Sequence, residues 1–241
     1  MRYEVHHCDC LDYLPWLDGK VDCIFADPPD GIGLKYAEYD DKISEVDYLF
    51  LLSTWIDRFV RKARTTWISF NAKWTVAMGG LVSQLQSAMP LLEVKPMVQT
   101  FTFGQHNKHD FGNNHRPLWR FRWPDAPIYP EQIKVPSWRQ KHGDKRAAPG
   151  GKVPGDVFNY PRVTGNSRQR RKWHPTQLHE GLVSRCIRSC TKEGDTVIDP
   201  FAGTGTTLRV CKRIDRSCLT FDIDRGYCEK IAEENGIDHI L

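Results

Sequence analysis

The sequence of 241 residues lacks any apolar run long enough to span a membrane, and its first residues, Met1 to His7, lack the apolar segment of a secretion signal. It also has no Cys-x-x-Cys pair of the kind found in zinc fingers. Its eight cysteines are therefore expected to be reduced thiols with packing roles rather than disulfides or metal ligands. These absences favour a globular protein of the cytoplasm, with no membrane and no metal among its partners.

The charge of the chain is small overall but uneven along the sequence. The formal net charge is +4, yet residues 104–175 hold fifteen Lys and Arg against five Asp and Glu, a net +10, while the rest carries −6. The same stretch is rich in Gly, Pro and aromatic residues, among them Trp119, Trp123 and Trp138. A basic, aromatic and loop-rich segment is typical of a surface that binds nucleic acid.

Strand and helix patterns alternate on both sides of this basic stretch. Strand patterns occur at residues 21–26, 66–70, 93–103, 196–199 and 217–223. Helical patterns follow Ser44, an expected N-cap with Asp47, and occur at 74–89, from near Thr176, at 206–214 and at 226–234. The alternation predicts one doubly wound α/β sheet, with the basic stretch inserted in it rather than forming a separate domain.

The strongest motif is Asp199-Pro200-Phe201-Ala202-Gly203-Thr204-Gly205-Thr206-Thr207, which follows a predicted strand and opens a predicted helix. Its two glycines allow a tight turn and a close backbone approach to a ligand, and the helix N-terminus is expected to offer free N–H groups. Asp222 ends the next predicted strand, nineteen residues after Gly203, where an acid binds ribose hydroxyls in nucleotide-binding α/β units. No lysine follows the glycines, so the motif predicts a nucleoside-type cofactor and not a triphosphate.

A second motif, Asp27-Pro28-Pro29-Asp30, also follows a predicted strand. The second proline has no N–H that would compete for the carbonyl of Pro28. An acid beside a fixed carbonyl is a suitable acceptor pair for a planar exocyclic amino group, whereas a rigid turn is the alternative for this motif taken alone. Because the carboxyl ends of parallel strands share one edge of a sheet, both motifs are expected at the same crevice.

Together the two motifs resemble those of DNA amino-methyltransferases that use S-adenosylmethionine: Asp27 to Asp30 resembles motif IV, and Asp199 to Thr207 resembles motif I. Their order, with the catalytic motif first, resembles the β class, in which the Rossmann-like sheet is circularly permuted. The resemblance implies a catalytic half at 1–103, an inserted basic target-recognition region at 104–175 and a cofactor-binding half at 176–241.

The resemblance also implies roles for individual residues. Val5 to Leu11 is similar to the amino-terminal motif of that class, whose acid, here Asp9, contacts the cofactor adenine, and Trp173 to Gln177 is similar to a segment that helps to hold the methionine end. The implied catalytic residues are Asp27, Pro28, Pro29 and Asp30. The implied residues for binding S-adenosylmethionine are Asp9, Cys10, His174, Thr176, Asp199, Phe201, Ala202, Gly203, Thr204, Gly205, Thr206 and Asp222.

One position departs from the family pattern, because Asp30 stands where the family has an aromatic residue that stacks on the flipped base. Such stacking is worth about 1–3 kcal/mol, which is similar to the few kcal/mol that base flipping costs. Three explanations are open: another ring (Tyr36, Tyr39 or Trp74) substitutes, the substrate is easier to flip, or activity is poor.

The resemblance implies methyl transfer to the exocyclic nitrogen of a base flipped out of double-stranded DNA, with Asp27 and the Pro28 carbonyl accepting the amino hydrogens. Adenine N6 is favoured, because cytosine-N4 relatives more often carry Ser at the position of Asp27. The alternatives are a cytosine-N4 enzyme and a catalytically impaired DNA-binding relative, which Asp30 alone supports. The chain has no Pro-Cys pair, so a cytosine-C5 mechanism is not expected, and the motif order disfavours RNA or protein-glutamine methylation.

Seven arginines of the basic region are candidates for contacts with guanine or phosphate: Arg116, Arg120, Arg122, Arg139, Arg168, Arg170 and Arg171. The recognition sequence is not readable from these residues, nor is the oligomeric state, for which a homodimer is one option. No nuclease motif is evident, so a stand-alone methyltransferase is the simpler expectation.

Overall fold

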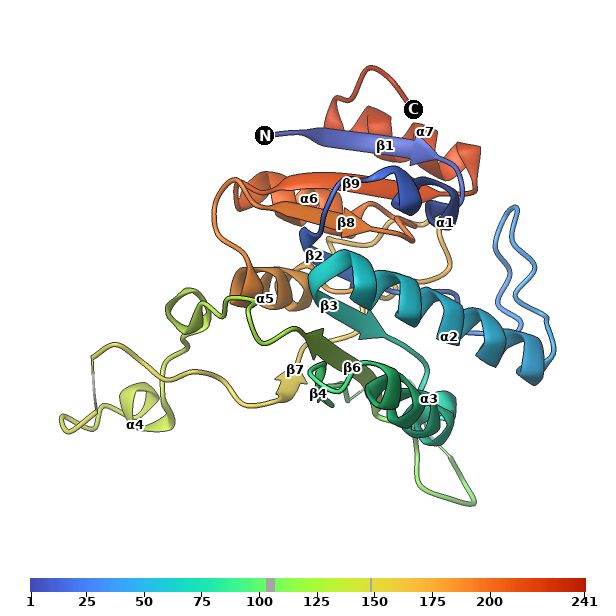
Figure 1. The fold of residues 1–241 in the computed structure, drawn as a ribbon. Helices are drawn as coiled ribbons and strands as arrows, with labels where there is room; N and C mark the ends of the chain where they lie inside the picture. The colour runs from blue at the N-terminus through green and yellow to red at the C-terminus, as the bar shows by residue number, and fades with distance from the viewer. Residues whose placement is uncertain (103–106, 148) are drawn as a thin grey trace.

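The computed structural model describes residues 1–102, 107–147 and 149–241, which form a nine-stranded sheet between two layers of helices (Figure 1). The strands run in the order β1, β9, β8, β2, β3, β6, β5, β7, and β4 also pairs with β6. Their bounds are β1 Tyr3–His7, β2 Val21–Ala26, β3 Ala63–Ser69, β4 Glu93–Lys95, β5 Val98–Thr100, β6 His115–Arg122, β7 Val157–Asn159, β8 Thr196–Asp199 and β9 Ser217–Asp222. The first five strands of this order are parallel, and β6 runs antiparallel to β3.

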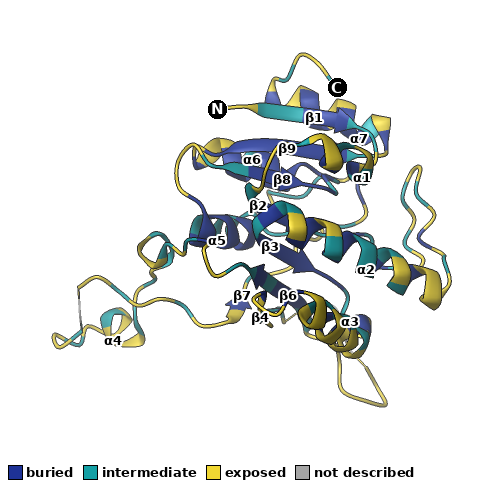
Figure 2. Cartoon of the chain, in the orientation of Figure 1, coloured by how far each residue is buried: buried dark blue, intermediate teal, exposed yellow. Residues whose placement is uncertain are grey.

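The helices cover both faces of the sheet. One layer holds α1 (Cys10–Tyr13), α2 (Glu45–Lys62) and α3 (Thr75–Ala88), and the other holds α5 (Glu180–Cys190), α6 (Thr206–Arg213) and α7 (Arg225–Asn235). Short elements complete the described chain: α4 (Trp138–Lys141) and the 3-10 turns η1 (Leu14–Trp16), η2 (Ala72–Trp74) and η3 (Pro130–Ile133). The α4 region extends away from the sheet and is largely exposed (Figure 2).

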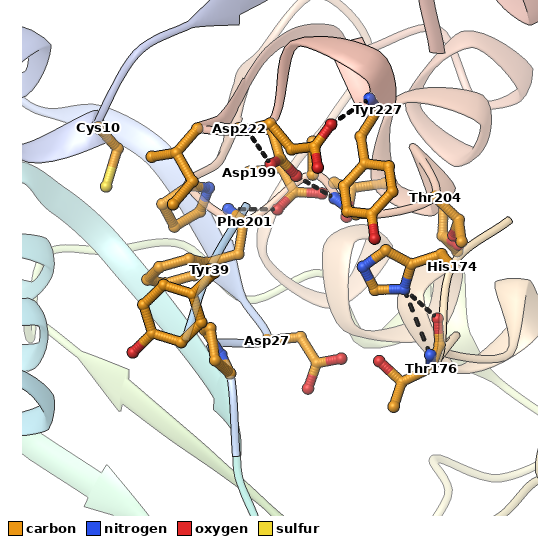
Figure 3. Close-up of a pocket in the computed structure, with 18 of the residues that line it drawn as sticks. Cys10, Asp27, Tyr39, His174, Thr176, Asp199, Phe201, Thr204, Asp222 and Tyr227 are labelled. Carbon is orange, nitrogen blue, oxygen red and sulfur yellow. Dashed lines mark hydrogen bonds between the residues drawn. The ribbon is translucent and has the colours of Figure 1, made fainter. Parts of the chain in front are cut away.

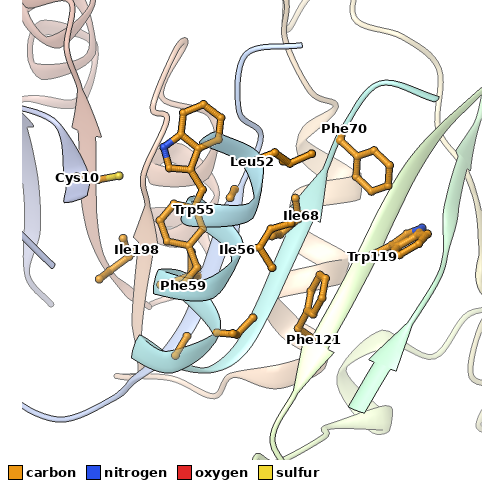
Figure 4. Packing of buried hydrophobic residues seen from close by; sticks show 14 of the residues in the cluster. Cys10, Leu52, Trp55, Ile56, Phe59, Ile68, Phe70, Trp119, Phe121 and Ile198 are labelled. Carbon is orange, nitrogen blue, oxygen red and sulfur yellow. The ribbon is translucent and has the colours of Figure 1, made fainter. Parts of the chain in front are cut away.

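Side chains of the central strands alternate between the two layers, as parallel strands buried on both faces require. On β2, Ile24 and Ala26 belong to the core under α2 and α3, whereas Cys23 and Phe25 belong to the core under α5 and α6. Figure 4 shows Leu52, Ile56 and Phe59 of α2 packed over the sheet. The eight cysteines are free, and all except Cys8 are buried. No helix of the described residues is long and apolar enough to cross a membrane.

The strand order creates a crevice between β8 and β2. After β8 the chain passes through α6 to β9 on one side, and after β2 it passes through α2 to β3 on the other side. Ligands of open α/β sheets bind where the strand order reverses in this way, outside the carboxyl ends of the strands. The predicted doubly wound, circularly permuted α/β sheet is confirmed, with its glycine loop between β8 and α6.

Most predicted elements are present with small differences. β2 and β8 have the predicted bounds, and Ser44 caps α2 by accepting the N–H of Asp47. The helix expected from near Thr176 begins only at Glu180, because His179 caps it through its side chain. The extended stretch expected at 93–103 is divided into β4 and β5, and residue 103 lies outside the described residues.

The basic stretch contributes to the sheet itself. β6 lies within residues 104–175, yet it pairs with β3 from Thr65 to Ser69 on one side and with β4 and β5 on the other. Two apolar residues of β6 are buried, Phe121 in the core under α2 and α3 and Leu118 in the core under α5 and α6. The sheet therefore passes through the region expected to be an insertion, and β7 of the same region pairs with β5.

Candidate active site

A large pocket lies at the carboxyl ends of the parallel strands (Figure 3). Its empty volume is about 1020 Å³, including space open to solvent. Segments far apart in the sequence meet there: Asp9 follows β1, Asp27 follows β2, Asp199 ends β8, and Asp222 ends β9. The pocket thus unites the two sequence motifs, as the shared edge of parallel strands requires.

The glycine loop has a backbone that only glycine adopts readily. Gly203 and Gly205 have φ angles of 51° and 69°. A Cβ atom at Gly203 would lie 3.1 Å from Nε2 of His174, and one at Gly205 would lie 3.0 Å from Ile231. Both positions therefore exclude a side chain on grounds of conformation and of space.

Several N–H groups of the loop before α6 are hydrogen-bonded within the protein. The Gly203 N–H donates to Oδ2 of Asp222 over 2.9 Å, and the Phe201 N–H donates to Oδ1 of Asp199 over 3.1 Å. The Ala202 N–H donates to the carbonyl of Phe221. The amides of Phe201 and Gly203 therefore orient two acids of the pocket.

These two acids have unusual titration behaviour. Burial raises the pKa of Asp199 to about 7, although hydrogen bonds from Thr207 and from the Phe201 amide oppose the rise. Burial likewise raises the pKa of Asp222 to about 6, against the opposing hydrogen bonds from the amides of Asp224 and Gly203. Displaced carboxyl pKa values in a cleft are a common property of ligand sites.

His174 and Thr176 form the opposite wall of the large pocket. Nδ1 of His174 lies 2.7 Å from the Thr176 carbonyl, and the ring sits between Tyr36 and Tyr227, at centroid distances of 5.6 and 4.9 Å. Burial lowers the pKa of His174. When the neutral ring donates from Nδ1 to the Thr176 carbonyl, its Nε2, which lies beside Gly203, carries no hydrogen and can act as an acceptor.

The lining suits a cationic nucleoside such as S-adenosylmethionine, which carries a sulfonium, an ammonium and ribose hydroxyls. Six acids and no Lys or Arg line the large pocket within the described residues: Asp9, Asp27, Glu38, Asp199, Asp222 and Asp224. Oδ2 of Asp224 and the hydroxyl of Tyr39 are both buried and have no hydrogen-bond partner among the described residues. Phe201, packed edge-on against Trp55 at 5.0 Å, supplies apolar surface for a flat ring. All twelve residues predicted for cofactor binding line this pocket except Gly205, which shapes its loop.

A second pocket of similar size, with an empty volume of about 1040 Å³ including space open to solvent, adjoins the large pocket and is called the side pocket. The two pockets share Asp27, Thr176, Gln177 and Leu178. Its other lining residues come from the catalytic motif, from β6 and from the loops around them: Asp30, Ile32, Leu34, Asn71, Ala72, Gln99, Phe101, Asn113, His115, Arg116, Arg162, Val163, Thr164 and Pro175. Asp27 therefore stands at the junction of two cavities, where one ligand can reach another.

The catalytic motif is held from three sides. The Tyr48 hydroxyl donates to the Pro29 carbonyl over 2.8 Å, and Nε1 of Trp74 donates to the Asp30 carbonyl over 2.7 Å. Asp41, which is 1% exposed, accepts the N–H groups of Gly31, Ile32 and Leu34. Trp74 is thus buried in a structural role, whereas Tyr36 and Tyr39, the other two rings considered as substitutes, line the large pocket.

Arg116 is placed inside the site. Its Nη2 lies 2.7 Å from Oδ1 of Asp27, and its Nη1 donates to Oδ2 of Asp30 over 3.1 Å. DNA contact by Arg116 stays a prediction, which this position limits to a base or backbone that enters the side pocket. Arg116 lies on β6, and this strand places part of the basic stretch next to the catalytic motif.

The other six arginines lie in different surroundings. Arg122 pairs with Glu93, Arg171 pairs with Glu234 of α7, and Arg170 donates to the carbonyls of Arg171 and Pro175. Arg120 is partly buried, with its guanidinium 6.0 Å from the centre of the Trp67 ring. Arg139 and Arg168 are exposed. DNA contact remains a prediction for these residues, and the exposed ones have the most freedom to make it.

Several residues of the site were not identified from sequence: Trp55, Asp41, Ile223, Asp224 and Tyr227. Asp41 and Trp55 lie outside the recognisable motifs, so spacing alone gives no signal for them. Asp224 is the N-cap of α7, because its side chain accepts a hydrogen bond from the Tyr227 N–H. A search of the sequence for helix starts could have found this residue.

Comparisons with known proteins agree with this geometry. The sequence profile of a family described as DNA methylase matches residues 21–234. The chain is 28% identical to the type II methyltransferase M.HpaI of Haemophilus parainfluenzae over 233 residues, which are 92% of this chain and 72% of that protein. It is also 28% identical to the DNA adenine methyltransferase YhdJ of Escherichia coli (strain K12) over 238 residues, 92% of this chain and 78% of that protein.

The fold is similar to that of solved methyltransferases. The PvuII DNA methyltransferase, described as cytosine-N4-specific, superposes with a TM-score of 0.68 at 15% identity, covering 95% of this chain and 86% of that chain. The family profile spans most of the chain, including both motifs that form the two pockets. The protein therefore belongs to the DNA methylase family of amino-methyltransferases, whose members transfer a methyl group from S-adenosylmethionine to adenine N6 or cytosine N4 of DNA.

Proposed function

We propose that this enzyme methylates N6 of adenine in double-stranded DNA. Asp27, the first residue of the catalytic motif, supports adenine, because cytosine-N4 relatives more often carry Ser there. The relative YhdJ, named a DNA adenine methyltransferase, is in line with this reading. A cytosine-N4 enzyme is the second candidate, supported by the structural similarity to the PvuII enzyme.

The observation that carries the proposal is the position of Asp27 between the two pockets. We assign the cofactor to the large pocket and the flipped base to the side pocket. Asp27 accepts one hydrogen of the target amino group, and the Pro28 carbonyl accepts the other. Tyr48 and Trp74 bind the carbonyls of Pro29 and Asp30, so they fix the turn that presents these acceptors.

In the large pocket, Asp222 accepts hydrogen bonds from ribose hydroxyls, and Asp9 and Cys10 lie at the adenine end. Asp199, His174 and Thr176 lie at the methionine end, and Phe201 to Thr206 form the wall between the two ends. S-adenosylmethionine supplies the methyl group when bound. The six acids around it favour a cation over a neutral or anionic molecule.

The protein's contribution to rate is positioning and charge. Two acceptors on the amino group direct the nitrogen lone pair toward the large pocket. Nitrogen gains positive charge during methyl transfer, and the Asp27 carboxylate stabilises that charge at short range in a partly buried site. Asp27 then accepts or relays the proton that nitrogen releases.

The division of the chain is part of the proposal: residues 1–103 as the catalytic half, 104–175 for target recognition and 176–241 as the cofactor-binding half. Within 104–175 we assign DNA contact first to the exposed Arg139 and Arg168. Arg116 belongs instead to the side pocket.

Expression of the protein in a methylation-free bacterial host, followed by mass analysis of digested DNA, tests this function. N6-methyladenine is expected in the digest, and modification-aware sequencing of the same DNA gives the recognition sequence. N4-methylcytosine would favour the second candidate, and no modified base with folded, cofactor-binding protein would favour an impaired DNA-binding relative.

A further inference from the structure

Asp30, Arg116 and Asp27 form a bridged set of charges at the base of the side pocket. Nη1 of Arg116 donates to Oδ2 of Asp30 over 3.1 Å, and Nη2 lies 2.9 Å from Oδ1 of the same carboxylate. Nη2 also donates to Oδ1 of Asp27 over 2.7 Å. One guanidinium therefore donates one hydrogen bond to Asp30 through Nη1 and one to the catalytic carboxylate through Nη2, and Nη2 also forms an ion-pair contact with Asp30.

The guanidinium has little freedom to leave this position. Its Nε donates to the Ser69 hydroxyl over 2.6 Å, so all three of its nitrogens have partners. The Asp30 side chain is 9% exposed and that of Arg116 is 19% exposed. The backbone of Asp30 is fixed in turn by Trp74, whose indole binds its carbonyl. A planar fork held at both ends is a rigid connector, which a lysine could not reproduce.

The bridge leaves Asp27 suited to its task. Arg116 takes Oδ1 of Asp27, which leaves Oδ2 for a substrate amino group. The rotation of the Asp27 carboxylate is therefore fixed before substrate arrives, and a preset acceptor costs no ordering at the moment of reaction.

The third charge matters as much as the geometry. Arg116 with Asp27 alone would form a neutral pair and cancel the negative charge that methyl transfer uses. Asp30 returns the group to a net charge of −1. Burial alone would lower the pKa of Arg116, but attraction to Asp27 and Asp30 outweighs it and raises that pKa, so the arginine stays charged.

We propose that Asp30 is a positioning residue for methyl transfer, which acts through Arg116 to orient Asp27 and to keep the site beside the target nitrogen negative. The proposal rests on the proposed function, because it assigns methyl transfer to Asp27. Asp30 thus has a different role from the stacking aromatic that the family carries at this position. It contacts Arg116 rather than the face of the base.

A double-mutant cycle with Asp30→Asn, Arg116→Met and the double variant tests the proposal. The readouts are the single-turnover methylation rate at saturating DNA and S-adenosylmethionine, the affinity for each, and base flipping, followed by the fluorescence of 2-aminopurine at the target position. Asp40→Asn is the matched control, because it removes an exposed acid of the neighbouring loop.

We expect Asp30→Asn to lower the single-turnover rate by about 10- to 100-fold, with the 2-aminopurine signal and both affinities within about threefold of wild type. The double variant should be no slower than the slower single variant, since residues that act as one unit are not additive. Asp40→Asn should keep the wild-type rate.

Three results would overturn the proposal. Rate losses of the two single variants that multiply in the double variant would mean that Asp30 does not act through Arg116. A lost flipping signal with an intact saturated rate would make Asp30 a base-capture residue. A wild-type rate in Asp30→Asn would give it no role.

If Asp30→Asn does not fold, Arg116→Lys gives the same information, because lysine keeps the charge and loses the fork. The rate should then fall at unchanged cofactor affinity, and a wild-type rate would refute the bridge. A wild-type enzyme that modifies no DNA would instead refute the proposed function, so the two failures are distinguishable.

Discussion

The amide of Gly203 donates to the carboxylate of Asp222 over 2.9 Å, so the glycine loop and the end of β9 form one hydrogen-bonded unit. In dinucleotide-binding sheets such a loop presents its amides to a pyrophosphate. S-adenosylmethionine has no phosphate, and here the amide fixes an acid instead. The pocket that results is strongly acidic, which is the opposite of a phosphate site.

This unit predicts that Gly203→Ala weakens cofactor binding by at least about tenfold. The φ angle of 51° is strained for alanine, and its Cβ would lie 3.1 Å from the His174 ring. Calorimetry with S-adenosylmethionine measures the effect. Gly79→Ala in the helix α3 is the control, because no atom of the described part of the chain lies within 4 Å of its Cβ, and affinity should be unchanged there. Equal affinities for both variants would argue against a cofactor at this loop.

Cofactor affinity should rise with pH between about 5 and 8. The pKa of Asp199 is about 7 and that of Asp222 about 6, and each acid carries the negative charge that attracts a cationic ligand only when it is ionised. Affinity should therefore fall by about tenfold per pH unit below the pKa of each group that must ionise. Calorimetry across this range measures the slope, and Asp222→Asn should flatten it below pH 6.

The stability of the cofactor-free protein should show the opposite pH trend. Burial raises the folded-state pKa of both acids above the unfolded value of about 4. The folded state thus holds protons that the unfolded state releases, and the contribution of these acids to the free energy of unfolding decreases as pH rises from about 4 to 7. Urea unfolding measures the free energy of unfolding of wild type and of Asp199→Asn at several pH values. The difference between the two slopes of this free energy against pH is the contribution of Asp199. Identical slopes would contradict the raised pKa of Asp199.

Asp41→Ala should destabilise the protein by about 3 kcal/mol or more and slow methylation. The buried carboxylate accepts three backbone N–H groups of residues 31–34, and its loss leaves these donors unsatisfied next to the catalytic motif. Denaturant unfolding and single-turnover rates measure the two effects. Asp40→Ala, an exposed neighbour, should change the stability by less than about 0.5 kcal/mol. Equal stabilities would show that Asp41 does not hold the loop.

DNA affinity should depend steeply on salt, and replacement of the exposed Arg168 and Lys172 by alanine should flatten that dependence. Each phosphate contact adds about 0.9 to the log–log slope. Arg171→Ala is the contrasting variant, because Arg171 pairs with Glu234 and its loss should lower the unfolding temperature more than the slope. An unchanged slope for the double variant would mean that DNA binds to another face.

The sequence predicted those parts of the site that depend on local pattern. The strand before Asp27 and the loop after Asp199 follow from apolar runs that end in Pro and Gly, and parallel pairing then places both acids at one edge. Arg116 could not be assigned in this way. Its position depends on the pairing of β6 with β3, which joins residues more than forty positions apart, and the many charges around β6 mask its apolar alternation.

The same distinction applies to the rings considered as substitutes for the missing aromatic. The sequence gives no reason to prefer one of Trp74, Tyr36 and Tyr39. Their different roles follow from tertiary packing alone. Trp74 stacks on Tyr48 at 4.6 Å and donates to Asp30, whereas Tyr36 and Tyr39 line the large pocket. Burial of a side chain against a distant segment leaves no periodic signal in the chain.

Methyl transfer by Asp27→Ala tests the central claim most directly. The side chain touches the substrate amino group and not the cofactor in this account, so removal of its carboxylate should act on turnover. With DNA that contains the recognition sequence, we predict a single-turnover rate at least about 100-fold below wild type, with S-adenosylmethionine affinity within about twofold. A variant that methylates the same DNA within about tenfold of the wild-type rate would contradict the assignment of Asp27 as the catalytic acceptor.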